Sequence, residues 1–150
     1  MAGKTVMAFG AFDGIHRGHL YYLSEAKKLG KLIVSVAPDR FFGLDMMYRM
    51  TEDERSDLVR ALRIVDKVVL GKEMNALARV EEMRPDMVVI TPYHWVDEAA
   101  LQQDLKKKGL KTKVVVLKPY KPESYGQIYD FAYVSLKEKR LSGLPIRKKK

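Results

Sequence analysis

The chain has 150 residues and a net charge of +9, and 47% of its residues are hydrophobic while 31% are charged. This length fits one domain with a sizeable core, and this balance excludes an intrinsically disordered chain. The sequence has no cysteine for a disulfide or a metal site, and without an apolar run near ~20 residues or a signal-like N-terminus we expect a cytoplasmic protein without a membrane span.

Short apolar runs typical of strands alternate along the chain with segments that have helical apolar spacing. In chain order, strands are expected at 4–10, 31–37, 65–70, 86–91 and 112–117. Helices are expected at 18–29, 52–62, 73–83, 97–108 and 124–139. This alternation predicts the α/β class, as a single Rossmann-like doubly wound domain with a five-stranded parallel sheet and helices on both faces.

Local signals mark several helix ends. Thr51 and Glu54 form a predicted capping box, and Asp97 is the expected cap of the helix that it opens. Gly30 is the expected stop of the first helix, and Arg84-Pro85 ends the third. The buried face of the first helix is predicted to carry its regularly spaced apolar residues, Leu20, Leu23, Ala26 and Leu29.

A basic segment ends the chain. From Lys137 to Lys150 there are seven basic residues and one acidic residue. We therefore divide the chain into a domain at 1–140 and a basic tail at 141–150. We interpret the tail as a solvated terminus, and binding of nucleic acid or an anionic surface is the alternative.

The most informative stretch follows the first predicted strand. Residues 10–19 read Gly-Ala-Phe-Asp-Gly-Ile-His-Arg-Gly-His. In open parallel sheets, ligands bind at the carboxyl ends of the strands, at the topological switch point. The glycines allow close approach of a ligand, and the start of the next helix offers free amides to a phosphate. The pattern is neither the dinucleotide-binding G-x-G-x-x-G nor a P-loop.

His16 and His19 stand three residues apart at this loop–helix junction. Residues at this spacing share one helix face, so both imidazoles could donate to one phosphate group. They could instead bind a metal, but a third ligand would be needed, and His94 is the only other histidine. In a purely structural alternative, one histidine caps the helix and the other packs.

Residues 10–19 resemble the G-T/S-F-D-x-x-H-x-G-H signature of the HxGH nucleotidyltransferases. That family includes glycerol-3-phosphate and choline-phosphate cytidylyltransferases, pantetheine-phosphate adenylyltransferases and archaeal FAD synthases. The resemblance implies transfer of a nucleotidyl group from a nucleoside triphosphate to a phosphorylated acceptor. Pyrophosphate leaves, and no covalent enzyme intermediate is expected.

The resemblance also implies roles for individual residues. His16 and His19 would be the catalytic pair, contacting the triphosphate and stabilising the transition state at its α-phosphorus. Mg²⁺, or another divalent cation that comes with ATP, would bridge phosphate oxygens; no residue of the chain is assigned as a metal ligand, and no permanently bound cofactor is expected. Asp13 would either hold the loop or contact the metal. The expected nucleotide-binding residues are Gly10, Ala11, Phe12, Asp13, Arg17, Gly18, Tyr93, Trp95, Ser124 and Tyr125.

The chain is most similar to the archaeal FAD synthases within that family, through segments 58–71, 84–92 and 96–117. The implied reaction joins ATP and FMN. An apolar cluster at 41–47 fits either a flat pocket for the isoalloxazine ring or a contact in a homodimer. The alternatives are a cytidylyltransferase acting on glycerol 3-phosphate or a polyol or choline phosphate, a pantetheine-phosphate adenylyltransferase, and a non-catalytic nucleotide-binding module.

The sequence departs from the family pattern at several positions. Ala11 stands where members usually carry Thr or Ser. In the loop at 38–49, often rich in lysine in the family, Arg40 and Arg49 are the only cations, so they are candidates for phosphate or acceptor contacts. The acid that often follows the fourth strand is missing from 91–95, where Trp95 could stack on a base or flavin ring.

Overall fold

The computed structural model describes residues 3–42, 50–72, 75–91, 96–118, 120, 143–145 and 147. Its strands are β1 (Thr5–Gly10), β2 (Lys31–Val36), β3 (Lys67–Leu70), β4 (Met87–Ile90) and β5 (Lys113–Val116). Its α-helices are α1 (Arg17–Lys27), α2 (Glu52–Arg60), α3 (Ala78–Met83) and α4 (Glu98–Lys107), and a short 3₁₀ helix, η1, spans Asp39–Phe42.

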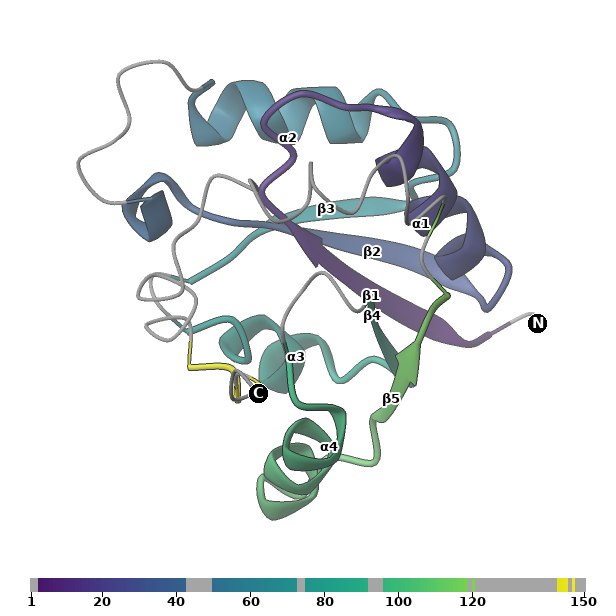
Figure 1. The fold of residues 1–150 in the computed structure, drawn as a ribbon, viewed down its shortest axis with the longest axis vertical. Coiled ribbons are helices and arrows are strands. Elements are labelled where there is room, and N and C mark those ends of the chain that lie inside the picture. Colours follow the sequence, from purple (N-terminus) through teal and green to yellow (C-terminus); the bar gives the residue numbers. More distant parts are fainter. Residues whose placement is uncertain are drawn as a thin grey trace.

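The five strands form one parallel sheet in the order β3-β2-β1-β4-β5 (Figure 1). The predicted fold class is confirmed. The chain winds outward from β1 to β3 and then crosses back to place β4 on the other side of β1. The topological switch point therefore lies between the carboxyl ends of β1 and β4.

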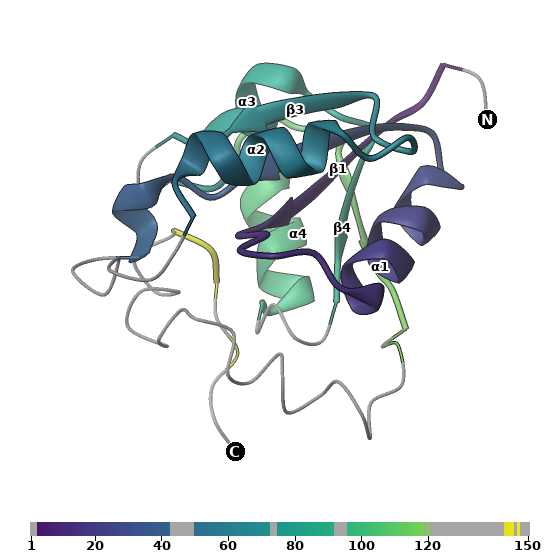
Figure 2. The same ribbon diagram turned by 90° about the horizontal axis from the view of Figure 1, so that it is seen from above.

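Each face of the sheet packs against its own pair of helices. On one face, alternate strand residues meet α1 and α2 in a cluster that includes Val6, Ala8, Leu32, Val34, Leu23 and Val59. On the other, the intervening residues meet α3 and α4 in a cluster that includes Met7, Ile33, Val88, Val80, Leu101 and Leu105. Figure 2 looks onto α1 and α2, with α4 beyond the sheet. Burial on both faces explains the continuous apolar runs of the strands.

The buried face of α1 differs from the prediction. Leu23 and Ala26 are buried as expected, but Leu20 is 41% exposed and Tyr22 is buried in its place. The inner face of α1 consists of Gly18, Tyr22, Leu23 and Ala26, and Leu20 lies outside this face. The prediction for Leu20 is wrong because apolar spacing alone does not show that the hydroxyl of the nearby Tyr22 has hydrogen-bond partners in the core.

Gly30 follows the end of α1 but does not have the positive φ of a left-handed C-terminal cap. The helix ends at Lys27, and a Cβ at Gly30 would lie 2.5 Å from the carbonyl oxygen of Lys4. The glycine is therefore required for the close approach of two backbone segments.

Two predicted caps are confirmed. Thr51 and Glu54 form the capping box of α2, and the Asp97 side chain accepts the amide of Ala100 at the start of α4. The third helix begins at Ala78, later than predicted, after an isolated bridge between Lys72 and Asn75. The side-chain Oδ1 of Asn75 accepts the amide of Leu77, and the backbone carbonyl of Asn75 accepts the amide of Ala78. This segment therefore forms a turn before the helix.

The expected last helix and most of the apolar cluster lie outside the described residues. Of the basic tail, residues 143–145 and 147 are described. The amide of Asp97 donates to the carbonyl of Pro145, 2.7 Å away, and Leu144 packs against the core beside α3 and α4. This part of the tail contacts the domain, so the interpretation of a wholly solvated terminus is wrong there.

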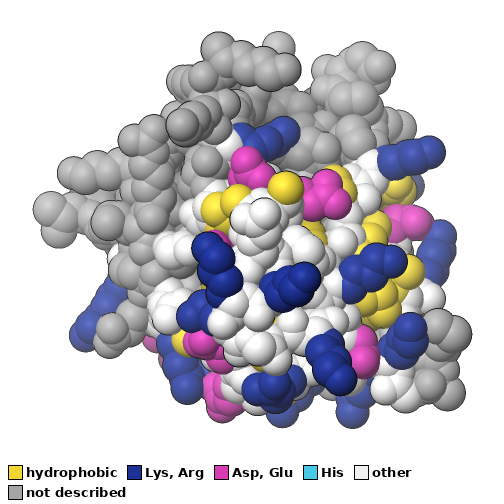
Figure 3. Space-filling view, turned by 90° about the horizontal axis from the view of Figure 1, so that it is seen from below, with side chains coloured by type: hydrophobic (Ala, Val, Ile, Leu, Met, Phe, Trp, Pro, Cys, Tyr) yellow, Lys and Arg dark blue, Asp and Glu magenta, His cyan; other side chains and the backbone are white. Residues whose placement is uncertain are grey.

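Basic side chains are spread over the surface opposite to that of Figure 2. Figure 3 shows Lys and Arg on this side separated by uncharged atoms, with acidic side chains between them. Among the described residues, several surface charges are paired, as in the contacts of Lys108 with Glu81 and of Arg79 with Glu82. None of the helices in the described part of the chain combines the length and hydropathy of a membrane span.

Candidate active site at the switch point

The loop between β1 and α1 begins where the two central strands separate. β1 pairs with β2 as far as Gly10 and Val36, but its last pair with β4 joins Ala8 and Val89. The final residues of β1 therefore have a strand on one side only. The predicted signature loop starts at this opening, at the carboxyl edge of the sheet, where open α/β sheets bind their ligands.

Two positive φ angles shape the loop. Phe12 has φ 54° and Gly14 has φ 92°. The Phe12 ring is buried and covers Gly10, where an added Cβ would lie 2.7 Å from the ring. Its centroid is also 5.3 Å from that of His19. Because the ring of Phe12 points into the core, only the backbone of this residue can face a ligand.

His16 and His19 together cap α1. Nδ1 of His16 accepts the amide of Gly18 at 3.0 Å, and Nδ1 of His19 accepts the amide of His16 at 3.3 Å. This is a capping box made by two imidazoles. His16 caps the helix, as the structural alternative expected, and His19 takes part in the same cap instead of only packing.

The capping box determines where the imidazole protons lie. A neutral imidazole has one donor and one acceptor nitrogen, and both Nδ1 atoms are used as acceptors. In its neutral form, each ring then carries its proton on Nε2. Burial lowers the pKa of His16 below its ordinary value, which favours this neutral form. Two Nε2–H donors on stacked rings are suited to the oxygens of a phosphate group.

Capping also changes the predicted role of the helix amides. We expected free amides at the start of α1, but the Gly18 amide donates to His16. The imidazoles thus take the place of this backbone amide as donors toward a ligand. Arg17, in the first turn, is exposed.

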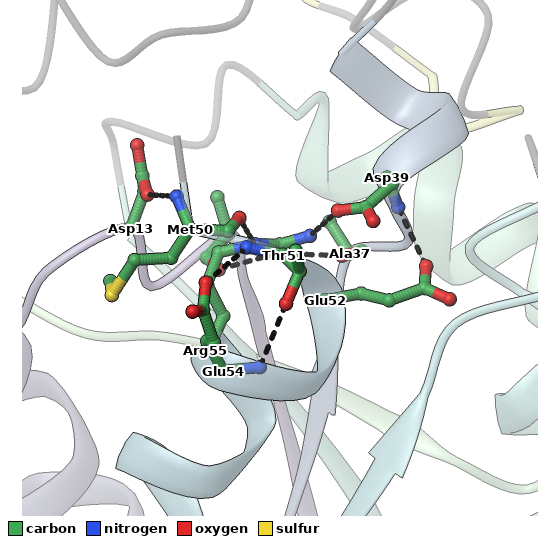
Figure 4. Close-up of polar contacts among 9 residues, drawn as sticks. Asp13, Ala37, Asp39, Met50, Thr51, Glu52, Glu54 and Arg55 are labelled. Carbon is green, nitrogen blue, oxygen red and sulfur yellow. Dashed lines mark hydrogen bonds and ion pairs between the residues drawn. The ribbon is translucent and has the colours of Figure 1, made fainter. Parts of the chain in front are cut away.

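A buried arginine that the sequence analysis missed joins the loops around the site. Arg55, on α2, is fully buried. Its Nη1 donates to the carbonyls of Ala11 and Ala37, both at 2.7 Å. Its Nε donates to the carbonyl of Met50, and its Nη2 to Asp39 (Figure 4). One side chain therefore connects the signature loop to the segment after β2.

Asp13 belongs to the same network. Its Oδ1 accepts the amide of Met50 at 3.0 Å (Figure 4). This contact fixes the distance between the signature loop and the residue that precedes α2. The loop-holding role, one of the two left open for Asp13, is the one observed.

A pocket of about 990 Å³ adjoins this network at the carboxyl ends of β2 and β3. Its wall carries both signs of charge, including Arg40 and Lys72 on the one hand and Asp39 and Glu52 on the other. The predicted contact residue Arg40 lines this pocket. Asp39 also bonds to Arg55, so the pocket and the signature loop share one framework.

The remaining predicted site residues lie outside the described residues: Arg49, Tyr93, Trp95, Ser124 and Tyr125. Their roles stay predictions. In the described part of the chain, no three His, Asp or Glu side chains gather closely enough to hold a metal ion.

The sequence did contain a signal for Arg55. It stands four residues before the buried Val59, so both lie on the inner face of α2. A basic residue on an apolar helix face needs several acceptors, and the two strand ends supply backbone carbonyls there.

The chain is similar to several known proteins. A family model described as cytidylyltransferase-like matches residues 7–148. An FAD synthase from Methanocella paludicola is 45% identical over 112 residues, which cover 73% of this chain and 80% of the relative. An FAD synthase from Aciduliprofundum boonei is 42% identical over 117 residues, covering 77% and 78% of the two chains.

A solved structure shares the fold. The lipopolysaccharide core biosynthesis protein from Thermoplasma volcanium superposes with a TM-score of 0.72 at 38% identity, over 78% of this chain and 98% of the other. The likeness thus extends over most of the sheet and its helices.

Proposed function

The chain belongs to the cytidylyltransferase-like family, and we propose that it is an FAD synthase that transfers AMP from ATP to FMN. Relatives of that name, about 40% identical, match over most of the chain. The observation that carries the proposal is the stacked imidazole pair at the switch point, whose Nδ1 atoms both accept backbone amides at the start of α1.

The reaction is a direct displacement at phosphorus. A phosphate oxygen of FMN attacks the α-phosphorus of ATP, and the new P–O bond forms as the bond to the β-phosphate oxygen breaks. Pyrophosphate leaves with the electron pair of that bond. The chain has no cysteine nucleophile, and none is required, because positioning and charge stabilisation account for most catalysis of such transfers.

His16 and His19 supply fixed donors for the charge that develops on the phosphate oxygens. Their rings are held by the helix cap, so little reorganisation is needed when the charge moves. Mg²⁺ bound to the triphosphate would neutralise further charge, and it would reach the site on the nucleotide. The fully buried Arg55 keeps the signature loop and the segment after β2 at a constant separation.

The pocket beside β2 and β3 is the candidate site for the acceptor. Arg40 is the candidate cation for a phosphate there, while Lys72 is paired with Glu82. The pocket connects to the signature loop through Asp39 and Arg55, which donates to the carbonyl of Ala11. The cytoplasmic location and the homodimer remain predictions.

The test is a matrix of donors and acceptors. The purified chain is incubated with ATP or CTP and with FMN, glycerol 3-phosphate, choline phosphate or phosphopantetheine, each with Mg²⁺, and pyrophosphate release is followed. Release only with ATP and FMN supports the proposal. Release with CTP and a polyol phosphate would instead identify a cytidylyltransferase, and no release with any pair would favour a non-catalytic module.

A further inference from the structure

Tyr22 reaches from α1 to the point where β1 and β4 separate. Its hydroxyl oxygen accepts the amide of Phe9 at 3.3 Å and its proton is donated to the carbonyl of Val89 at 2.7 Å. These two backbone groups belong to different strands, beside the last β1–β4 pair, Ala8 with Val89. A single hydroxyl therefore bridges both strands at the edge of the switch point.

The position of this hydroxyl is closely constrained. The Tyr22 side chain is almost completely buried, with 6% exposure, and packs in the core between the sheet and α1 and α2. Burial raises the pKa of Tyr22, so the phenol keeps the proton that it donates to Val89. The helix therefore cannot slide or turn against the strands without breaking a buried hydrogen bond.

Tyr22 shares a helix face with His19. The two residues are three positions apart on α1, which corresponds to about 4.5 Å along the helix axis. His19 in turn accepts the amide of His16, and the two rings stack with centroids 3.9 Å apart. The height and rotation that Tyr22 imposes on α1 are thus passed to both imidazoles.

We propose that Tyr22 is a positioning residue for catalysis, which sets the place of the His16–His19 pair over the strand ends through its bridge between Phe9 and Val89. This inference rests on the proposed function, because it assigns the pair a role in the transition state. It goes beyond that function by placing a determinant of the rate in the core, away from any substrate.

A matched control is available at the opposite edge of the sheet. Thr112 is also buried, and its hydroxyl donates to the carbonyl of Pro85 at 2.6 Å. Tyr22→Phe and Thr112→Val each remove one buried hydroxyl that donates to a backbone carbonyl and keep most of the side-chain shape. Both variants should lower the melting temperature.

The steady-state kinetics should separate the two variants. We expect Tyr22→Phe to lower kcat about tenfold and to leave KM for ATP nearly unchanged. The reason is that displaced imidazoles lose contacts that they make only in the transition state. Thr112→Val should keep kcat within about twofold. Equal kcat for Tyr22→Phe and the unchanged protein, or an equal loss in both variants, would overturn the proposal.

A double-mutant cycle tests whether Tyr22 acts through the imidazole. In a His19→Asn background, Tyr22→Phe should change the residual kcat less than about twofold, because residues that act together are not additive. A full tenfold loss in that background would contradict the proposal.

A spectroscopic measurement is independent of the activity. With only three histidines in the chain, the ring signals of His16 and His19 can be assigned in an NMR spectrum by single substitution. Tyr22→Phe should shift them, and Thr112→Val should not. If the unchanged protein makes no FAD, the proposed function fails by itself. Unshifted histidine signals in Tyr22→Phe would overturn the positioning role in either case.

Discussion

The imidazole rings of His16 and His19 stack with their centroids 3.9 Å apart and their planes at 27°. Each ring uses Nδ1 to hold the start of α1, and this contact leaves Nε2 as the donor nitrogen of the neutral ring. The pair therefore combines a structural contact with a predicted catalytic one, made by opposite sides of the same rings.

The two roles of His16 can be separated by substitution. Asn is among the most favourable N-cap residues, so His16→Asn should change the free energy of unfolding by less than about 0.5 kcal/mol. FAD formation should fall by about 10² or more, because the Nε2–H donor is lost. Denaturant titration and kcat measure the two effects. His16→Ala is the control, which should lose the rate together with about 1 kcal/mol of stability.

The stability of the fold should depend on pH through the same residue. Burial lowers the pKa of His16 in the folded state below the ordinary value of 6.5, so the unfolded chain binds the proton more tightly. The contribution of neutral His16 is complete above pH 6.5 and is lost as the pH falls through the lowered pKa. Protonation also removes the Nδ1 acceptor of the Gly18 amide.

The measurement is the urea midpoint between pH 8 and pH 5, for the unchanged chain and for His16→Asn. The midpoint of the unchanged chain should decrease more steeply below pH 6.5. Parallel curves for the two proteins would contradict the assignment. The carboxylates of Asp66, Glu82 and Asp86 have lowered pKa values, so they titrate in a separate, more acidic range.

Local patterns made much of this fold predictable. The capping box of Thr51 and Glu54 and the cap at Asp97 involve groups within three residues of one another, so residue types and spacing reveal them. The strands were identifiable because both faces of the sheet are buried. The signature loop was identifiable because His16 and His19 follow a strand end and lie among glycines.

The contacts that support the site were not predictable in this way. Arg55 bonds to Ala11 across 44 positions of the chain, and Tyr22 to Val89 across 67. The residue types of Ala11 and Val89 do not mark them as partners, because both accept through backbone carbonyls, which every residue carries. Only the strand order brings those carbonyls together.

Arg55 should make a large contribution to stability. Arg55→Met removes hydrogen bonds to the partly buried carbonyls of Ala11 and Ala37 and leaves Asp39 without this guanidinium. We expect a loss of about 1–3 kcal/mol in the free energy of unfolding, measured in urea.

Asp39→Asn is the matched control for Arg55. The Asp39 side chain is 32% exposed, and the amide oxygen of Asn can still accept from Arg55, so the loss should be about 1 kcal/mol or less. Equal losses in Arg55→Met and Asp39→Asn would show that the ion pair, and not the carbonyl contacts, determines the effect.

Arg40 should affect the acceptor more than the nucleotide. It lines the pocket beside β2 and β3, so Arg40→Gln should raise KM for FMN about tenfold while KM for ATP stays within about twofold. Arg63→Gln is the control, because Arg63 is an exposed residue that precedes β3 and so lies toward the opposite edge of the sheet. A rise in KM for ATP alone would assign Arg40 to the triphosphate.

The most direct test follows the fate of the α-phosphorus of ATP. The chain is incubated with FMN and either α-³²P- or γ-³²P-labelled ATP, and the products are separated. With direct transfer we expect the α-label in FAD and the γ-label in pyrophosphate, in equal amounts, and both signals should fall by about 10² or more in His16→Asn. Reactions in which no labelled FAD forms, or a His16→Asn variant that labels FAD at the full rate, would contradict this mechanism.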